Sequence, residues 1–234
     1  MSLSTAAASA AAQQVAEQLR IQNMKKGKTA EQKRIIDFFF NVGNEKKGCL
    51  SKGGYGLTMN EYLKIVQDKV NVLNSKAKAI EKIGLDESEI QEIAPIILAS
   101  FLYDDDALIK VENGQAVSSQ YAITWIFFSA TQIYTYKFIF DTTSDNTWEF
   151  TNDFFYTDIT CFSTSRMLKE KIDVKISQGC MKSGEDYIKN NYIVDKFEII
   201  VPGTSYSFSM RNSDTFERSL QAAKAMLREK KFKK

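Results

Sequence analysis

The segment YAITWIFFSATQIYTYKFIF, residues 121–140, is the most apolar stretch of the chain, and the rest of the sequence is interpreted around it. Side chains alternate between the two faces of a β-strand, so residues two apart share a face. Large apolar residues occupy the odd positions first and the even positions afterwards: Tyr121, Ile123, Trp125 and Phe127, then Tyr134, Tyr136, Phe138 and Phe140. This change of parity across residues 129–132 predicts two antiparallel strands joined by a tight turn.

A membrane-spanning helix is the main alternative for so apolar a segment. Such a helix needs about 20 consecutive apolar residues, whereas Lys137 and several Thr and Gln residues interrupt this segment. Its aromatic and β-branched residues favour strands of an antiparallel sheet. We therefore expect the segment to lie in a sheet.

Strand-like segments continue to residue 210. One or two strands are predicted in TWEFTNDFFYTDITCFSTS (147–165), and one each in KEKIDVKIS (169–177), YIVDKFEIIV (192–201) and TSYSFSM (204–210). Pro202-Gly203 predicts a turn between the last two. A closing helix is expected from a capping box at Asp214 and Glu217 and from an apolar stripe: Phe216, Leu220, Ala223 and Leu227.

The N-terminal half has a helical pattern. We expect a weakly anchored helix in the first 26 residues, a short helix in KTAEQKRIIDFFFNV (28–42), and a flexible connection in the glycine-rich segment 43–58. Thr58 and Glu61 form a capping box that predicts a long helix ending near Gly84. A second capping box at Asp86 and Glu89 predicts another helix up to residue 103, so that residues 58–106 form a helical hairpin.

These expectations divide the chain into a basic helical and linker segment (1–57), a helical hairpin (58–106) and an antiparallel β domain with a C-terminal helix (107–234). The fold class is α+β. In its order of elements, a strand meander followed by one helix, residues 107–234 resemble the pleckstrin-homology-like superfold, including its bacterial members. That resemblance implies a strongly bent or nearly closed barrel with the helix closing one end, and a binding role. Lipid-binding members hold head groups with a basic first hairpin loop, but loop 129–132 here has no Lys or Arg.

The composition limits the kinds of catalytic, metal-binding and cofactor-binding site that this chain can form. The 234 residues include no His, which removes the commonest general base and the commonest zinc ligand. The three cysteines, Cys49, Cys161 and Cys180, are far apart and show no C-x-x-C spacing, which is typical of a reducing, cytoplasmic compartment. The glycines near residue 53 do not match a P-loop, because Gly54 occupies the position of its Lys. We expect no cofactor.

Acidic residues offer two further candidate sites. Asp104, Asp105 and Asp106 are consecutive, but the ligand spacing of a calcium loop is missing, so no metal is expected there. Four more acidic residues lie at or near predicted strand ends: Asp141, Asp145, Asp153 and Asp158. Turn residues are the expected role, and a pair serving acid–base catalysis is the alternative.

Charge is spread unevenly along the chain. The formal net charge is only +2, but both ends are basic and the middle is acidic. Four lysines close the chain: Lys230, Lys231, Lys233 and Lys234. Cations at a helix C-terminus offset the helix dipole, and the alternative role is contact with an anionic membrane surface. No nucleic-acid partner is expected, because the pI is about 8.2 and no nucleic-acid-binding signature is found.

Three functional hypotheses follow. The first is a non-enzymatic intracellular adaptor whose exposed edge strands and the groove beside the terminal helix, residues 214–230, contact a protein or peptide. The second is peripheral binding to an anionic membrane through the terminal lysines. The third is an enzyme that uses Asp, Tyr or Lys in place of His. The apolar stripe on residues 62–80 also allows self-association through the helices.

Overall fold

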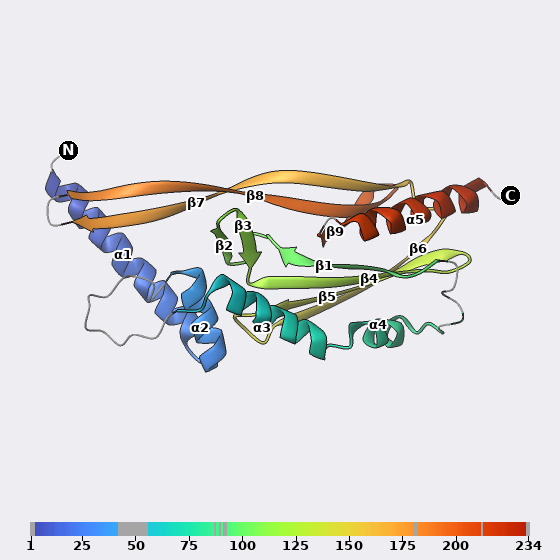
Figure 1. Ribbon diagram of the computed structural model, residues 1–234, viewed down its shortest axis with the longest axis horizontal. Helices are drawn as coiled ribbons and strands as arrows, with labels where there is room; N and C mark the ends of the chain where they lie inside the picture. The colour runs from blue at the N-terminus through green and yellow to red at the C-terminus, as the bar shows by residue number, and fades with distance from the viewer. Residues whose placement is uncertain are drawn as a thin grey trace.

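Two antiparallel sheets, a small hairpin and five helices make up the described part of the chain. The computed structural model describes residues 3–41, 56–86, 88, 90, 93–179, 182–211 and 213–232. The molecule is elongated, and the two termini lie at opposite ends (Figure 1). These elements confirm the α+β class and the antiparallel pairing.

The first sheet has the strand order β1-β4-β5-β6, formed by Ile96–Leu102, Gln120–Phe128, Gln132–Asp141 and Thr147–Phe155. Strands β4 and β5 are the two predicted at residues 121–140. Their register places Tyr121 opposite Phe140 and Phe127 opposite Tyr134, so the odd and even apolar positions share one face. The turn between them is closed by a hydrogen bond from the N–H of Ser129 to the carbonyl of Gln132, at 3.0 Å. The strand pair and its turn are confirmed.

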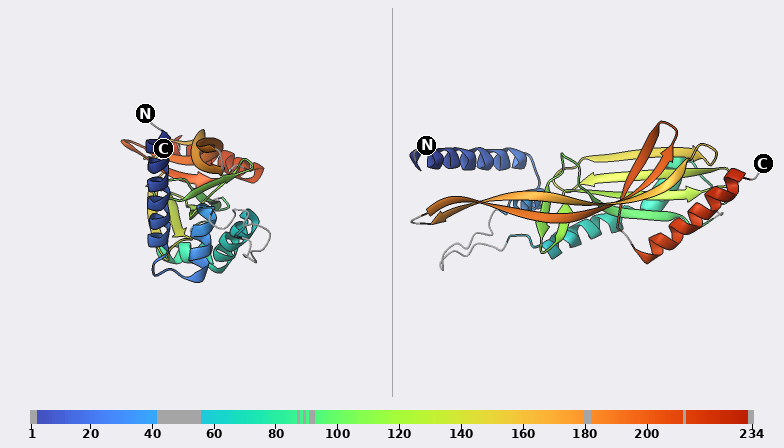
Figure 2. Two further views of the ribbon diagram at one scale, coloured as in Figure 1. Left: turned by 90° about the vertical axis from the view of Figure 1, so that its left-hand side faces the viewer. Right: turned by 90° about the horizontal axis from the view of Figure 1, so that it is seen from above.

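The second sheet has the order β7-β8-β9, formed by Cys161–Gly179, Lys182–Val201 and Thr204–Met210. Strands β7 and β8 are much longer than the segments 169–177 and 192–201 expected from sequence. They form a twisted ribbon that runs along most of the molecule and projects from one end beside the N-terminal helix (Figure 2). A separate hairpin of β2 (Ile109–Glu112) and β3 (Gln115–Ser118) lies in sequence between β1 and β4 of the first sheet and contacts β8.

Three helices cover the outer face of the first sheet: α2 (Ala30–Phe39), α3 (Met59–Val72) and α4 (Ser75–Ile83). The predicted capping box of α3 at Thr58 and Glu61 is confirmed, and α2 begins with a capping box at Thr29 and Gln32. The apolar faces of the helices pack on the aromatic face of β4 and β5 in one cluster, which includes Ile35, Phe38, Tyr62, Val66, Phe127, Tyr136 and Phe138. Tyr62 and Val66 are therefore buried inside the chain, and self-association through the helices stays a prediction.

The inner face of the first sheet packs against the second sheet and α5 (Asp214–Phe232). The predicted stripe of α5 is buried there: Phe216, Leu220, Ala223 and Leu227. The predicted cap is wrong by one residue, because the N–H of Phe216 donates to the side-chain oxygen of Ser213 at 3.2 Å, and Asp214 already begins the helix. Burial of this stripe along a helix of several turns supplies most of the favourable free energy of its docking.

The predicted helical hairpin of residues 58–106 is wrong in its second half. Residues 96–102 form β1, in which Ile96 pairs with Ile126 and Leu102 with Gln120. A short continuous apolar run fits a strand as well as a helix, and here Ile96, Leu98 and Leu102 are buried while Ile97 is half-exposed. The long helix predicted from Thr58 to Gly84 is also divided, because Asn74 adopts a left-handed φ of 41° between α3 and α4.

The N-terminal helix α1 (Leu3–Lys25) is present, and its Val15 and Leu19 are exposed, as expected of a weakly anchored helix. Part of the glycine-rich connection, with Gly48, Gly53 and Gly54, lies outside the described residues, as does the cap residue Glu89. None of the helices in the described ranges combines the length and apolar character that crossing a bilayer requires.

Candidate functional site

Strand β6 is a free edge of the first sheet, since in the described part of the chain it pairs with β5 alone. Hydrogen bonds at both ends of this pairing show which way its backbone groups point. The N–H of Asp141 donates to the carbonyl of Asn146 at 3.1 Å, and the N–H of Tyr156 donates to the carbonyl of Thr131 at 3.2 Å. The register between these two pairs is uninterrupted.

Hydrogen-bonded pairs alternate with non-hydrogen-bonded pairs in an antiparallel ladder. Even-numbered residues of β6 therefore direct their N–H and C=O groups to β5, and odd-numbered residues direct theirs away from the sheet. Glu149, Thr151 and Asp153 thus present outward backbone groups, and no backbone hydrogen bond reaches them from other described residues. Unpaired groups of this kind form a template for another strand.

Two aromatic side chains stand on the inner face of this edge. Trp148 is 36% exposed and Phe150 is 49% exposed, although both lie in a sheet whose central strands are largely buried. They are opposite Ile139 and Lys137 of β5. Burial lowers the pKa of the Lys137 ammonium. The edge therefore offers an apolar surface with one partly desolvated cation behind it.

The outer face of the edge is tied to helix α4. The carboxylate of Glu149 forms ion pairs with the ammonium groups of Lys78 and Lys82, with N–O distances of 2.5 Å and 3.5 Å. The hydrogen bond from Lys78 is the main cause that lowers the pKa of Glu149. The Lys78 ammonium also lies 4.4 Å from the centre of the Phe138 ring. These contacts hold the middle of β6 in place without covering its backbone.

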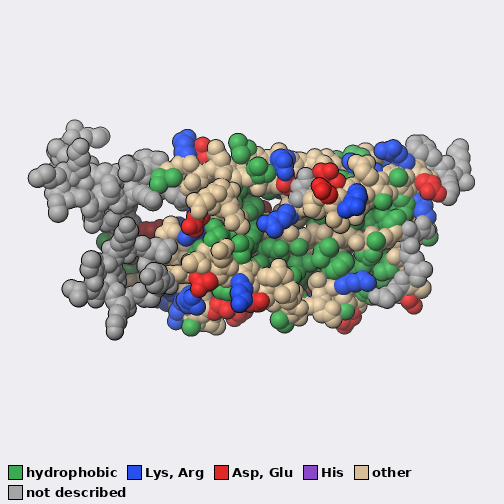
Figure 3. Space-filling view, viewed as in Figure 1, with side chains coloured by type: hydrophobic (Ala, Val, Ile, Leu, Met, Phe, Trp, Pro, Cys, Tyr) green, Lys and Arg blue, Asp and Glu red, His purple; other side chains and the backbone are tan. Residues whose placement is uncertain are grey.

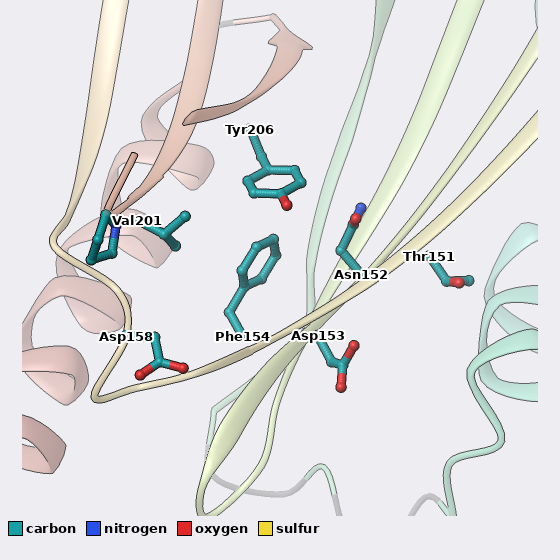
Figure 4. Close-up of a pocket in the computed structure, with 8 residues that line it drawn as sticks. Thr151, Asn152, Asp153, Phe154, Asp158, Val201 and Tyr206 are labelled. Atoms are coloured by element: carbon teal, nitrogen blue, oxygen red, sulfur yellow. The ribbon is translucent and has the colours of Figure 1, made fainter. Parts of the chain in front are cut away.

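A hollow of about 460 Å³ opens at the end of β6, where the strand approaches the turn between β8 and β9 (Figure 4). Its lining comes from β6, from the segment after it and from the β8–β9 hairpin: Thr151, Asn152, Asp153, Phe154, Asp158, Val201, Pro202 and Tyr206. The rings of Phe154 and Tyr206 meet edge to face, with centroids 4.8 Å apart. An aromatic pair and two carboxylates thus border one opening.

The four acidic residues near strand ends have two different environments. Asp141 accepts hydrogen bonds from the N–H and hydroxyl of Thr143, and Asp145 accepts one from Gln32 at 2.8 Å, so both serve turns and packing. Asp153 and Asp158 instead line the hollow. Among the described residues, no group of three potential ligands is placed to hold a metal ion.

The terminal lysines do not join this site. The Lys231 ammonium donates to the carbonyl of Thr160 at 3.3 Å, and Lys230 is half-buried near the end of α5. Lys233 and Lys234 lie outside the described residues. The contact of Lys231 fits a role in fixing the helix end, and a membrane contact stays a prediction.

Sequence reasoning missed the site on β6, although it found the strand. The signal was the shared parity of Trp148, Phe150 and Phe154, which placed aromatics on one face of the predicted strand. Their exposure follows from the position of β6 at the edge, and that position depends on β1 joining the opposite side of β4. A comparison with protein-family models, curated proteins and solved structures finds no match to this chain.

Proposed function

We propose that this protein is a non-enzymatic binding or adaptor module that takes up an extended segment of a protein or peptide partner as an added strand along β6. One observation carries the proposal: the outward backbone groups of Glu149, Thr151 and Asp153 lie beside the half-exposed rings of Trp148 and Phe150. In strand addition, backbone hydrogen bonds supply affinity and alternate side chains supply specificity.

The two faces of β6 differ in the side chains that they offer to an added strand. On the inner face the partner meets Trp148 and Phe150, which favour apolar residues at every second position. Toward the hollow it meets the carboxylates of Asp153 and Asp158, which favour a Lys or Arg. We therefore expect a partner segment that alternates apolar residues with polar ones and has a basic residue near the hollow.

A pleckstrin-homology-like arrangement of the two sheets is part of this proposal. It is supported by the strand order, by β1 and β9 lying side by side where the two sheets meet, and by α5 packing over the core between them. In this interpretation the sheets form a strongly bent barrel that α5 closes. The free edge of β6 then lies at the corner that the helix leaves open.

The proposal can be tested with a phage library of random peptides of about 12 residues, long enough to pair with the whole strand. Enriched peptides are synthesised with a fluorescent label, and their affinity is measured by polarisation for the wild type, for Thr151→Pro and for Thr151→Val. Proline removes the outward N–H without touching the β5 ladder, whereas valine keeps the N–H and the branched shape.

We expect Thr151→Pro to weaken binding by at least about tenfold, which corresponds to loss of about 1.4 kcal/mol. Thr151→Val should bind within about threefold of the wild type. Equal affinity of all three proteins would contradict strand addition at β6, as would enrichment of no peptide at all. Circular dichroism shows whether both variants keep the fold.

A further inference from the structure

The ribbon of β7 and β8 has a second exposed surface, on the side away from the molecule's body. Cross-strand pairing puts Arg166 with Asp195, Leu168 with Ile193, and Ile172 with Lys189 on this outer face. Leu168 is 71% exposed, Ile193 is 53% exposed and Ile172 is 52% exposed. Hydrophobic side chains are visible along the ribbon in the upper part of Figure 3. Leu168 and Ile193 are opposite each other and form a small aliphatic patch in solvent, and Ile172 lies four residues further along the same face of β7.

The inner face of the same ribbon faces the body of the molecule. The Lys169 ammonium donates to the carbonyl of Tyr103 at 3.1 Å, and the Lys171 ammonium donates to the carbonyl of Ile109. Tyr192 and Val194 of the same inner face are also buried, so this side of the ribbon packs on the body of the molecule. The outer face, where Leu168 and Ile193 are exposed, is not covered by other described residues and is suited to contact with another protein surface.

The charges on the outer face match a second copy of the same face. Arg166 pairs with Asp195 at 2.8 Å, and Glu170 pairs with Lys189 at 3.2 Å. Along β7 a cation therefore precedes Leu168 by two residues, and a carboxylate follows it by two. Two copies can stack these faces on each other about a two-fold axis that passes between them at Leu168. Arg166 of each copy then lies opposite Glu170 of the other.

We propose that this face, defined by residues 166–172 and 189–195, is the contact of a homodimer. Leu168 packs on Leu168 of the second copy and Ile193 on Ile193, with two reciprocal Arg166–Glu170 ion pairs across the axis. The described strip measures roughly 25 Å by 10 Å, well below the ~800 Å² per partner of a stable interface. The dimer is therefore a weak and reversible one.

Sedimentation velocity of the full chain between about 5 and 500 µM measures this association. We expect the weight-average sedimentation coefficient to rise with concentration for the wild type. Arg166→Glu alone and Glu170→Arg alone place like charges across the axis, so each should associate at least about tenfold more weakly. An equimolar mixture of the two variants restores opposite charges at both contacts and should recover association to within about threefold of the wild type.

Two further variants separate this contact from a change of fold or a general charge effect. Leu168→Ser alters a side chain that is mostly exposed, so the fold should persist while association falls at least about tenfold. Lys64→Glu reverses an exposed charge on α3 and should leave association unchanged. The proposal is overturned if the wild type stays monomeric throughout, if the single variants associate like the wild type, or if their mixture stays monomeric.

Discussion

The hydroxyl of Tyr62 is fully buried between α3 and the first sheet. It donates to the carbonyl of Ser118 at 2.5 Å and lies 3.1 Å from the hydroxyl of Thr142, which in turn donates to the carbonyl of Ser119. Burial raises the pKa of this phenol far above its usual range, so it is a neutral donor throughout the physiological range. One side chain thus satisfies a buried carbonyl near the end of β3 and joins it to the helix layer.

Tyr62→Phe removes this donor and leaves the carbonyl of Ser118 without it. We expect the free energy of unfolding to fall by about 1–2 kcal/mol, because a buried acceptor then loses a hydrogen bond. Urea denaturation measures the change. Tyr206→Phe is the matched control, since its half-buried hydroxyl has no hydrogen bond among the described residues. If the free energy of unfolding fell equally in both variants, the hydrogen bond to Ser118 would not be the cause of the loss.

At the scale of the elements, the ion pairs of Glu149 with Lys78 and Lys82 join α4 to β6. The lowered pKa of Glu149 means that the folded state favours its charged form. A group of this kind contributes stability above its unfolded pKa of 4.5, and the contribution is lost as pH falls below that value.

Glu149→Gln should therefore be less stable than the wild type near pH 6.5, and the difference should vanish near pH 3. Urea denaturation of both proteins at the two pH values gives the comparison. Glu112→Gln, at an exposed position of β2, serves as the control for loss of a surface carboxylate. A difference between wild type and Glu149→Gln that is the same at both pH values would contradict the assigned role.

The sequence predicted elements well where the period of apolar residues was unambiguous. Strands β4 and β5, helices α2 and α3, and the stripe of α5 all follow from alternation or helical spacing. It failed at β1, where Ile96 and Leu98 belong to a continuous apolar run that fits either structure. It also failed at Asn74, whose left-handed backbone ends one helix where the apolar spacing continued. Pairing with β4 decided the first case, and one left-handed residue made the second.

At the scale of the whole molecule, the candidate site depends on topology. The aromatic residues of β6 are visible in the sequence, but their exposure requires β1 at the opposite edge and a second sheet that leaves this corner open. The site is assembled from β6 and a hairpin about 50 residues later, at Val201 and Tyr206. Long-range arrangement of this kind could not be predicted from local patterns.

Hydrogen exchange of the β6 amides, followed by NMR on the full chain with and without an enriched peptide, tests the central claim most directly. In the free protein we expect the N–H groups of Trp148, Phe150 and Asn152 to be protected and those of Glu149, Thr151 and Asp153 to exchange rapidly. Added peptide should slow the second set by at least about tenfold. Protection of that set in the free protein, or rapid exchange that the bound peptide leaves unchanged, would contradict strand addition along β6.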